Sequence, residues 1–180
     1  NDCLNLNQGK DNAESVMVAQ QAVAACKEMM ELARVSGKKT DIIKYKKMAD
    51  KMTAQINKVA WDGKWYMRAF DDNKKAVGSS KNAAGKIFLE TQGWGVISGV
   101  ADAKKAKQCL DSVNEHLATK HGILILQPAF EEFDHTLGSI TVYPPGLKEN
   151  AAIFCHPNPW IMIAECIAGR GDQAYEYYKA

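Results

Sequence analysis

The pattern of helical stretches joined by loops limits the fold of this chain more than any other feature. Residues 12–36 and 40–61 carry small and apolar side chains at helical spacing, and shorter helical stretches follow at 92–100, 102–119, 158–168 and 172–180. Candidate strands are few, because only residues 65–79 predict a β-hairpin or ordered loop and residues 122–126 a short buried run. The sequence therefore predicts an all-α scaffold of stacked antiparallel hairpins, a toroid or solenoid.

Polar residues and a glycine mark the expected ends of these helices. Asp11 or Asn12 is expected to cap the first helix, and Gly37 to end it. Thr40 is expected to cap the second helix and Asn158 the fifth, which has a proline in its first turn. A toroid of this type needs about a dozen helices, so the expected five or six form roughly half of one.

Composition describes one globular domain with few obvious partners. The chain has 180 residues, and 46% of them are hydrophobic. Its formal net charge of +2 is too small to indicate nucleic acid or an anionic membrane as a partner, and the sequence has no long apolar run. The chain begins without Met inside what reads as a motif, so we expect it to be part of a longer polypeptide.

The five cysteines, odd in number and without CxxC spacing, argue against a disulfide framework or a zinc site. They indicate a reducing, cytoplasmic compartment, in which they serve mainly as small buried apolar residues. The four histidines share no ligand spacing either, so no metal site is expected.

Residues 128–158 form a connection far longer than usual, and a loop of that length inside a compact domain is usually functional. Its second half, with the following helix start, includes an acid (Glu149), an amide (Asn150), an imidazole (His156) and the aromatic residues Tyr143 and Trp160. Glu149 is suited to accept hydrogen bonds from sugar hydroxyls, although the sequence is equally compatible with an ordinary exposed glutamate in a loop. His156 is suited to bind an anion at the following helix N-terminus, although a structural histidine is equally compatible.

Asp2 is the third candidate, near the start of a polar loop. An aspartate beside an asparagine is typical of a surface turn or a helix cap. The functional interpretation is a general acid whose pKa is raised by burial, so that it can protonate a leaving oxygen.

Four motifs resemble those of the inverting disaccharide phosphorylases typified by cellobiose phosphorylase, glycoside hydrolase family 94. Residues 1–6, NDCLNL, resemble the end of that family's DWNDCLNL motif, and residues 65–72, WYMRAFDD, resemble WYxRAYDD. Residues 91–99 resemble a Q-S-W…SG segment, and residues 143–160 resemble YPPGxKEN…H…W. Because the four motifs occur in the family's order and span the chain, they are specific together.

The resemblance implies an (α/α)6-barrel catalytic domain, of which residues 1–180 are a part, in a parent enzyme that is a homodimer. It implies phosphorolysis of a β-linked glucosyl disaccharide, with cellobiose first, to α-glucose 1-phosphate and a free sugar. Asp2 matches the general acid, His156 a phosphate ligand, and Tyr143 and Glu149 positions that line the sugar subsites. Inorganic phosphate is a co-substrate, and no cofactor is implied.

Several alternatives remain open. Phosphorolysis of diacetylchitobiose, laminaribiose or cellodextrins fits the same motifs, although a bulky Tyr143 would crowd a 2-acetamido group and favours glucose. An inverting hydrolase on the same toroid needs a second carboxylate to activate water. A non-catalytic helical scaffold or carbohydrate-binding module predicts that Asp2, Glu149 and His156 lie apart. The upstream arginine and downstream Thr-Gly phosphate contacts of the family are missing here, and Ala151 replaces a frequent glycine, so the isolated 180 residues are expected to be inactive.

Overall fold

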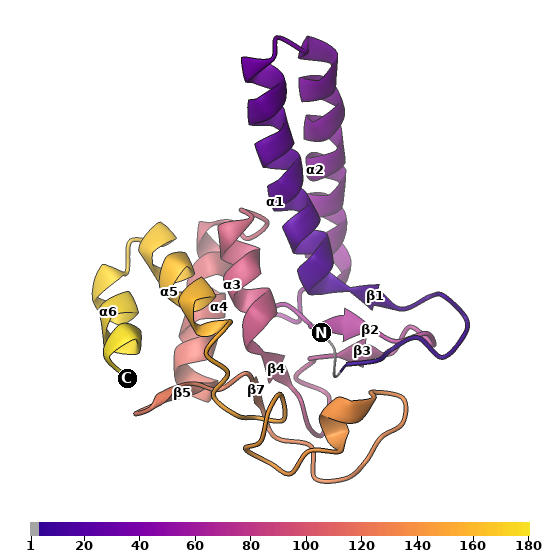
Figure 1. Ribbon diagram of the computed structural model, residues 1–180, viewed down its shortest axis with the longest axis vertical. Coiled ribbons are helices and arrows are strands. Elements are labelled where there is room, and N and C mark those ends of the chain that lie inside the picture. Colours follow the sequence, from indigo (N-terminus) through magenta and orange to yellow (C-terminus); the bar gives the residue numbers. More distant parts are fainter. Residues whose placement is uncertain (1–3) are drawn as a thin grey trace.

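The computed structural model describes residues 4–180, and it is helical with short strands between the helices (Figure 1). Six α-helices are described: α1 Val16–Val35, α2 Lys39–Val59, α3 Leu89–Ile97, α4 Ala103–His116, α5 Asn158–Ile167 and α6 Gly171–Lys179. The two-residue strands are β1 Glu14–Ser15, β2 Ala69–Phe70, β3 Ala76–Val77, β4 Ile87–Phe88, β5 Ala118–Thr119, β6 Gly122–Ile123 and β7 Leu126–Gln127. A 3-10 turn, η1, covers Ser139–Thr141.

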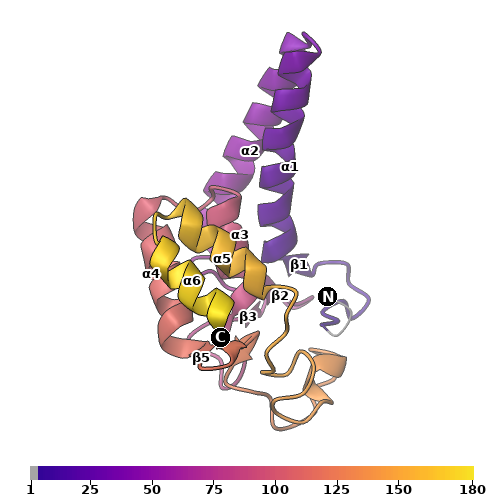
Figure 2. The same ribbon diagram turned by 60° about the vertical axis from the view of Figure 1, so that its left-hand side comes forward.

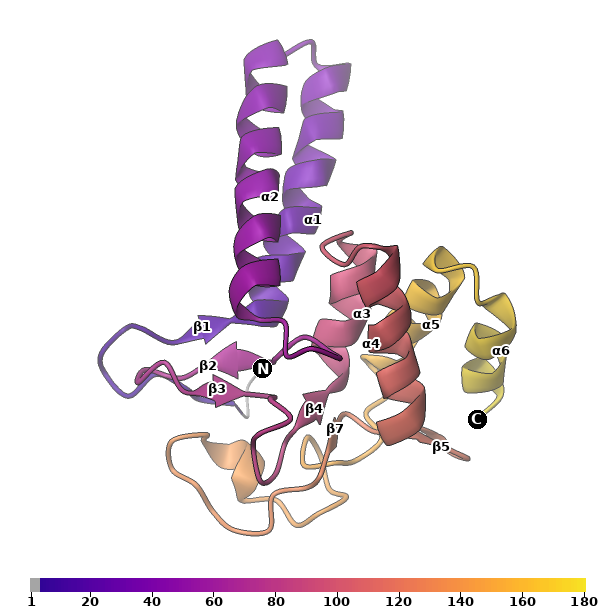
Figure 3. The same ribbon diagram turned by 180° about the vertical axis from the view of Figure 1, so that it is seen from behind.

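The helices form successive pairs. α1 and α2 make a long antiparallel hairpin that extends away from the rest of the molecule (Figure 1). α3 packs against α1, α4 and α5, and α6 packs on α5; the view in Figure 2 brings α5 and α6 forward, and Figure 3 shows α3 and α4 from behind. The helical domain expected from the sequence is therefore confirmed.

The central helix α3 is buried along most of its length, and two glycines allow its neighbours to approach closely. A Cβ on Gly93 would lie 3.3 Å from Trp160 and Ile161 of α5, and one on Gly95 would lie 2.9 Å from the ring of Tyr66. Glycine normally weakens a helix interior by about 1 kcal/mol relative to alanine, so these positions exchange propensity for close packing.

The expected β-hairpin is confirmed as β2 and β3, and β1 adds to it in the antiparallel order β1-β2-β3. This pairing corrects the start of the first helix, which begins at Val16 and not at residue 12. Ser15 is the N-cap, and its hydroxyl accepts from the Val18 N–H. Asn12 fails as a cap because Glu14 and Ser15 pair with β2, an interaction that local propensity does not report.

Other helix ends differ from expectation in similar ways. α2 begins at Lys39 after Lys38, so Thr40 lies inside the helix and does not cap it. α5 has Pro157 as its N-cap, because the Asn158 side chain bonds to Ile123 and Phe154 instead. Gly37 does end the first hairpin's ascending helix with a positive φ of 68°.

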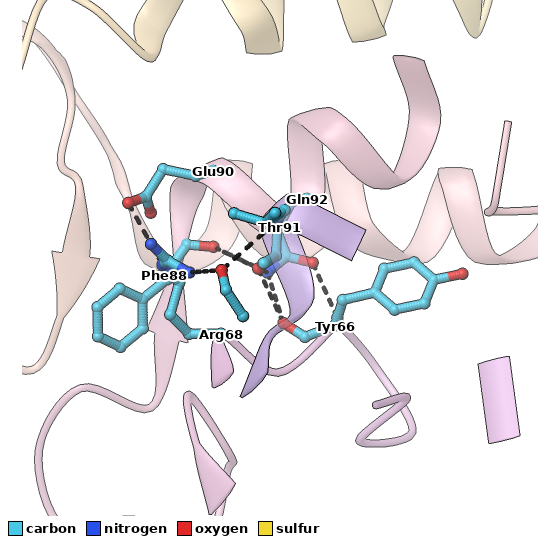
Figure 4. Close-up of polar contacts among 8 residues, drawn as sticks. Tyr66, Arg68, Phe88, Glu90, Thr91 and Gln92 are labelled. Atoms are coloured by element: carbon cyan, nitrogen blue, oxygen red, sulfur yellow. Dashed lines mark hydrogen bonds and ion pairs between the residues drawn. The ribbon is translucent and has the colours of Figure 1, made fainter. Parts of the chain in front are cut away.

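A buried polar cluster joins α3 to the segment that leads into the hairpin (Figure 4). The Gln92 amide accepts from the Tyr66 N–H at 2.9 Å and donates to the carbonyls of Tyr66 and Phe88 at 2.9 and 2.8 Å. Arg68 and Glu90, both almost fully buried, form an ion pair at 3.5 Å beside it. The Gln92 bonds satisfy backbone groups of Tyr66 and Phe88 that burial would otherwise leave unpaired.

The expectation that the cysteines are buried holds for only part of the described set. Among the described cysteines, Cys26 and Cys109 are buried as expected, whereas Cys155 and Cys166 are exposed free thiols. The buried interpretation is therefore wrong for these two. No helix within residues 4–180 is long and apolar enough to cross a membrane.

The approach of β3 to β2 generates a stability prediction. Gly78 has φ +87°, and a Cβ there would lie 2.5 Å from the Arg68 backbone nitrogen. Gly63 has a similar φ of +93° with nothing near its Cβ position, so Gly63→Ala tests backbone strain alone. We expect Gly63→Ala to cost about 1–2 kcal/mol of unfolding free energy, and Gly78→Ala to cost about 1–3 kcal/mol more from overpacking. Denaturant unfolding of both variants measures the difference, and equal losses would contradict the contact.

Candidate functional site

The loop that carries two of the predicted site residues is ordered by one buried side chain, that of Asn150. Its Oδ1 accepts from the Phe130 N–H at 2.8 Å, and its Nδ2 donates to the carbonyls of Phe130 at 2.8 Å and Tyr143 at 2.6 Å. Asn150 is fully buried. One amide therefore fastens the start of the loop to the segment that precedes Glu149.

Tyr143 is half-buried beside a lysine of the same loop. The Lys148 ammonium lies 4.8 Å from the centre of the Tyr143 ring and 3.4 Å from its hydroxyl. Lys148 and Ala151 both have positive φ, 50° and 59°. Such conformations cost non-glycine residues about 1 kcal/mol or more, so the surrounding contacts impose this loop shape.

The segment after Glu149 is tied to the strand region by backbone pairing. The Ile125 N–H donates to the Ala152 carbonyl at 2.9 Å, and Leu124 forms a bridge with Ile153. The Asn158 side chain then holds Ile123 through both its backbone groups, at 2.9 and 3.0 Å. His156 therefore lies in a short turn between two fixed points.

His156 is exposed and lies at the end of an aromatic series. Its ring contacts Trp160 edge-on at 5.0 Å between centroids, and Trp160 contacts Trp94 of α3 at 5.5 Å. These contacts orient the imidazole from α5 and α3. Because Pro157 gives no side-chain cap, the first N–H groups of α5 beside His156 receive no side-chain acceptor from the N-cap.

Asp2 lies outside the described residues, but the segment that follows it is described. The Asn5 N–H donates to the Leu137 carbonyl at 3.0 Å, and Leu6 is buried with Phe130 and Ala151 in one core cluster. The amino-terminal segment therefore packs against the loop that holds Tyr143 and Glu149.

Asp72 binds the backbone of the segment that follows Leu6. Its carboxylate accepts from the N–H groups of Lys10, Asn12 and Ala13 at 2.8–3.0 Å and also from that of Gln8. Burial acts to raise the pKa of Asp72, and the four N–H donors outweigh it, so its pKa lies below the ordinary value. Asp72 is thus held ionised by backbone dipoles.

A cavity with a volume of about 640 Å³ is a separate feature. It lies between the β2–β3 hairpin and the first part of the long loop, and its ionisable lining residues are Asp71, Lys75, Glu131, Glu132, Asp134 and His135. The lining does not include Tyr143, Glu149 or His156.

Glu165 has the most strongly raised carboxyl pKa of those that resolve a shift, about 7. Burial raises it, and Arg170, 2.8 Å away, opposes the rise. Arg170 also pairs with Asp111 at 2.8 Å, so this cluster ties α4, α5 and the start of α6 together. Residues 4–180 contain no group of three or more His, Cys, Asp or Glu side chains placed to hold a metal ion.

Comparison with known proteins places this arrangement in a family. The model of the glycosyl hydrolase 94 superfamily, catalytic domain, matches residues 1–180. The chain belongs to this superfamily. The resemblance noted from the four motifs is therefore confirmed.

Several relatives of this chain are named as disaccharide phosphorylases. The N,N'-diacetylchitobiose phosphorylase of Vibrio proteolyticus is 37% identical over 100% of this chain and 22% of its own length. The solabiose phosphorylase of Paenibacillus borealis is 34% identical over 99% of this chain and 23% of its own length. A 3-O-beta-D-glucopyranosyl-beta-D-glucuronide phosphorylase of the same species is 35% identical over 72% of the chain. The chain thus spans less than a quarter of the length of the first two relatives.

The residues that organise this site were not all found in the sequence. The sequence shows Asn150 only as part of a dense polar segment and does not show that its side chain holds the loop together. It shows Asp72 only as part of a family motif. The doubled aspartate after a strand was the available signal, but which of the two reaches the amino-terminal segment depends on the hairpin turn.

The role of Asn150 generates a prediction. Asn150→Ala leaves the Phe130 N–H without its amide acceptor and two carbonyls without their donor, and we expect a loss of about 3 kcal/mol. The loop at 129–151 should become sensitive to proteolysis and exchange its amide hydrogens faster. Asn114 is the control, because its side-chain oxygen Oδ1 accepts from the Tyr177 hydroxyl at 3.2 Å. Asn114→Ala should leave the loop protected. A loop that stays protected in Asn150→Ala would contradict the clamp.

Proposed function

We propose that this chain is part of the catalytic domain of an inverting phosphorylase that cleaves a β-linked disaccharide with inorganic phosphate. The observation that carries the proposal is the family match over residues 1–180, joined to relatives that are named as phosphorylases. The ordered loop and the turn at His156 support it, because rigid loops are suited to hold a sugar and an oxyanion.

In this mechanism Asp2 is the general acid. Its carboxyl proton passes to the glycosidic oxygen as the bond from that oxygen to the anomeric carbon breaks. A phosphate oxygen forms the new bond to the same carbon from the opposite face, which gives an α-sugar 1-phosphate and a free sugar. Asp2 is left as a carboxylate and is reprotonated before the next turnover. No second carboxylate is needed as a base, because phosphate is already an anionic nucleophile.

His156 is proposed to hold the phosphate, and Tyr143 and Glu149 to line the sugar subsites. The lack of a side-chain cap at the start of α5 supports the first assignment, since the helix dipole favours an anion there. The position of Tyr143 beside the Lys148 ammonium supports a polar subsite wall with an aromatic face.

The substrate is proposed only as a β-linked disaccharide. The motif resemblance favours cellobiose, and the bulk of Tyr143 favours glucose over a 2-acetamido sugar, but the relatives do not support cellobiose. Their names give diacetylchitobiose, solabiose and a glucosyl-glucuronide as substrates of those proteins. A panel of these sugars with cellobiose and laminaribiose is therefore the appropriate test.

The complete domain is proposed to be an (α/α)6 barrel in a longer, cytoplasmic, homodimeric enzyme. The pairs α1–α2, α3–α4 and α5–α6 would be three of its six hairpins. Apolar side chains exposed along the first hairpin, among them Leu32, Val35 and Ile43, support a covering by further helices. The isolated 180 residues are accordingly expected to release no sugar phosphate.

The decisive experiment measures phosphate-dependent cleavage by the full-length enzyme over that panel. We expect α-sugar 1-phosphate as product, and cleavage at equal rate without phosphate would instead indicate a hydrolase. Asp2→Asn should lower kcat roughly 10²- to 10⁴-fold. His156→Ala should raise the apparent KM for phosphate about tenfold or more, as expected for loss of a charge-assisted hydrogen bond. Full activity of Asp2→Asn would remove it from the mechanism.

A further inference from the structure

Asp72 makes a set of contacts that its position in the hairpin turn does not require. Its side chain is buried, with a relative exposure of 2%, and within the described residues its hydrogen bonds are with backbone N–H groups of residues 8–13. A carboxylate can accept about four hydrogen bonds, so four N–H donors saturate it. The two segments it joins are about sixty residues apart in the sequence.

The contact is reciprocal and extends to the start of the described chain. The Asp72 N–H donates to the Leu6 carbonyl at 3.2 Å, while the Asn5 N–H donates to Leu137 at 3.0 Å. Leu6 is buried between these two bonds. Residues 5–13 are therefore fixed to the hairpin on one side and to the long loop on the other.

The conformation of this segment is one that the chain would not adopt unaided. Asp11 has a positive φ of 54°, and the loop turns at Gly9 with φ +88°. Several N–H groups that converge on one point also repel each other unless an anion lies between them. The Asp72 carboxylate supplies that anion and so determines the path of the segment.

We propose that Asp72 is a positioning residue for catalysis, which sets the placement of the proton donor by fixing the segment that follows it. The inference rests on the proposed function, in which Asp2 is the acid. Asp2 lies two positions before Leu4, the first residue that the structure describes. Fixing the backbone next to a catalytic group matters because a misplacement of about 1 Å lowers a rate on the order of 10²-fold.

The neighbouring aspartate provides a matched control. Asp71 is also buried, but its Oδ1 accepts from the N–H groups of Asn73 and Lys75 inside its own turn, at 2.9 and 2.7 Å. Asp71→Asn therefore removes the same charge at the adjacent position without touching residues 8–13. Each carboxylate oxygen of Asp72 accepts two of the four bonds. In Asp72→Asn the amide nitrogen would therefore face two N–H donors, and two of the four bonds are replaced by repulsion.

The test compares two leaving groups in the full-length enzyme. Phosphorolysis of the disaccharide needs a proton on the leaving oxygen, whereas a dinitrophenyl β-glycoside of the same sugar leaves without one. We expect Asp72→Asn to lower kcat for the disaccharide about 10- to 100-fold and for the aryl glycoside less than about threefold. The KM for phosphate should stay within about threefold, and Asp72→Glu should restore part of the disaccharide rate.

Each outcome decides between positioning and a general structural role. Equal losses on both substrates, or no loss on either, would overturn the proposal, and so would an Asp71→Asn variant with the same selective loss. If Asp72→Asn does not fold, the ratio of the two substrates in Asp72→Glu decides in the same way. Failure of the proposed function itself is distinguishable, because then wild-type enzyme would cleave no disaccharide of the panel in a phosphate-dependent way.

Discussion

Buried backbone groups in irregular segments must find hydrogen-bond partners, and in this protein polar side chains from distant positions supply them. Gln92 provides the central example, because its one amide binds both backbone groups of Tyr66 and the carbonyl of Phe88. This connection joins α3, which is buried along most of its length, to the segment that leads into the hairpin. The residues just before the hairpin are thereby fixed to α3.

The same device recurs at the margins of the candidate site. Asn150 binds Phe130 and Tyr143, and Asn158 binds Ile123 and Phe154. Asp72 does the equivalent for the amino-terminal segment with a charge in place of an amide. An unpaired buried amide or carbonyl costs about 1–3 kcal/mol, so each of these side chains makes one loop path more stable than its alternatives. Long loops can in this way be as well defined as helices.

The arrangement connects the amino-terminal segment to the start of α5. The amino-terminal segment packs on the long loop through Leu6, and the loop continues into the turn at His156 and the start of α5. The described residues of the first family motif, 4–6, and the motifs at 65–72 and 143–160 thus belong to one connected set of elements: segment, hairpin and loop. In a phosphorylase this would allow the acid, the sugar contacts and the phosphate ligand to be held by a common framework.

The sequence alone determined the helical class, the approximate places of the helices, the β-hairpin, the irregular nature of residues 128–158 and, through its motifs, the family. These properties depend on local periodicity, turn chemistry and linear order, which a sequence contains. Only the tertiary structure decided where α1 begins, why Asn158 does not cap α5, and which of the two adjacent aspartates, Asp71 or Asp72, holds the amino-terminal segment. Those choices depend on competition between partners far apart in the chain. A side chain or backbone group that could bond to a neighbour in the sequence bonds instead to a distant group, because that distant group would otherwise be buried without a partner.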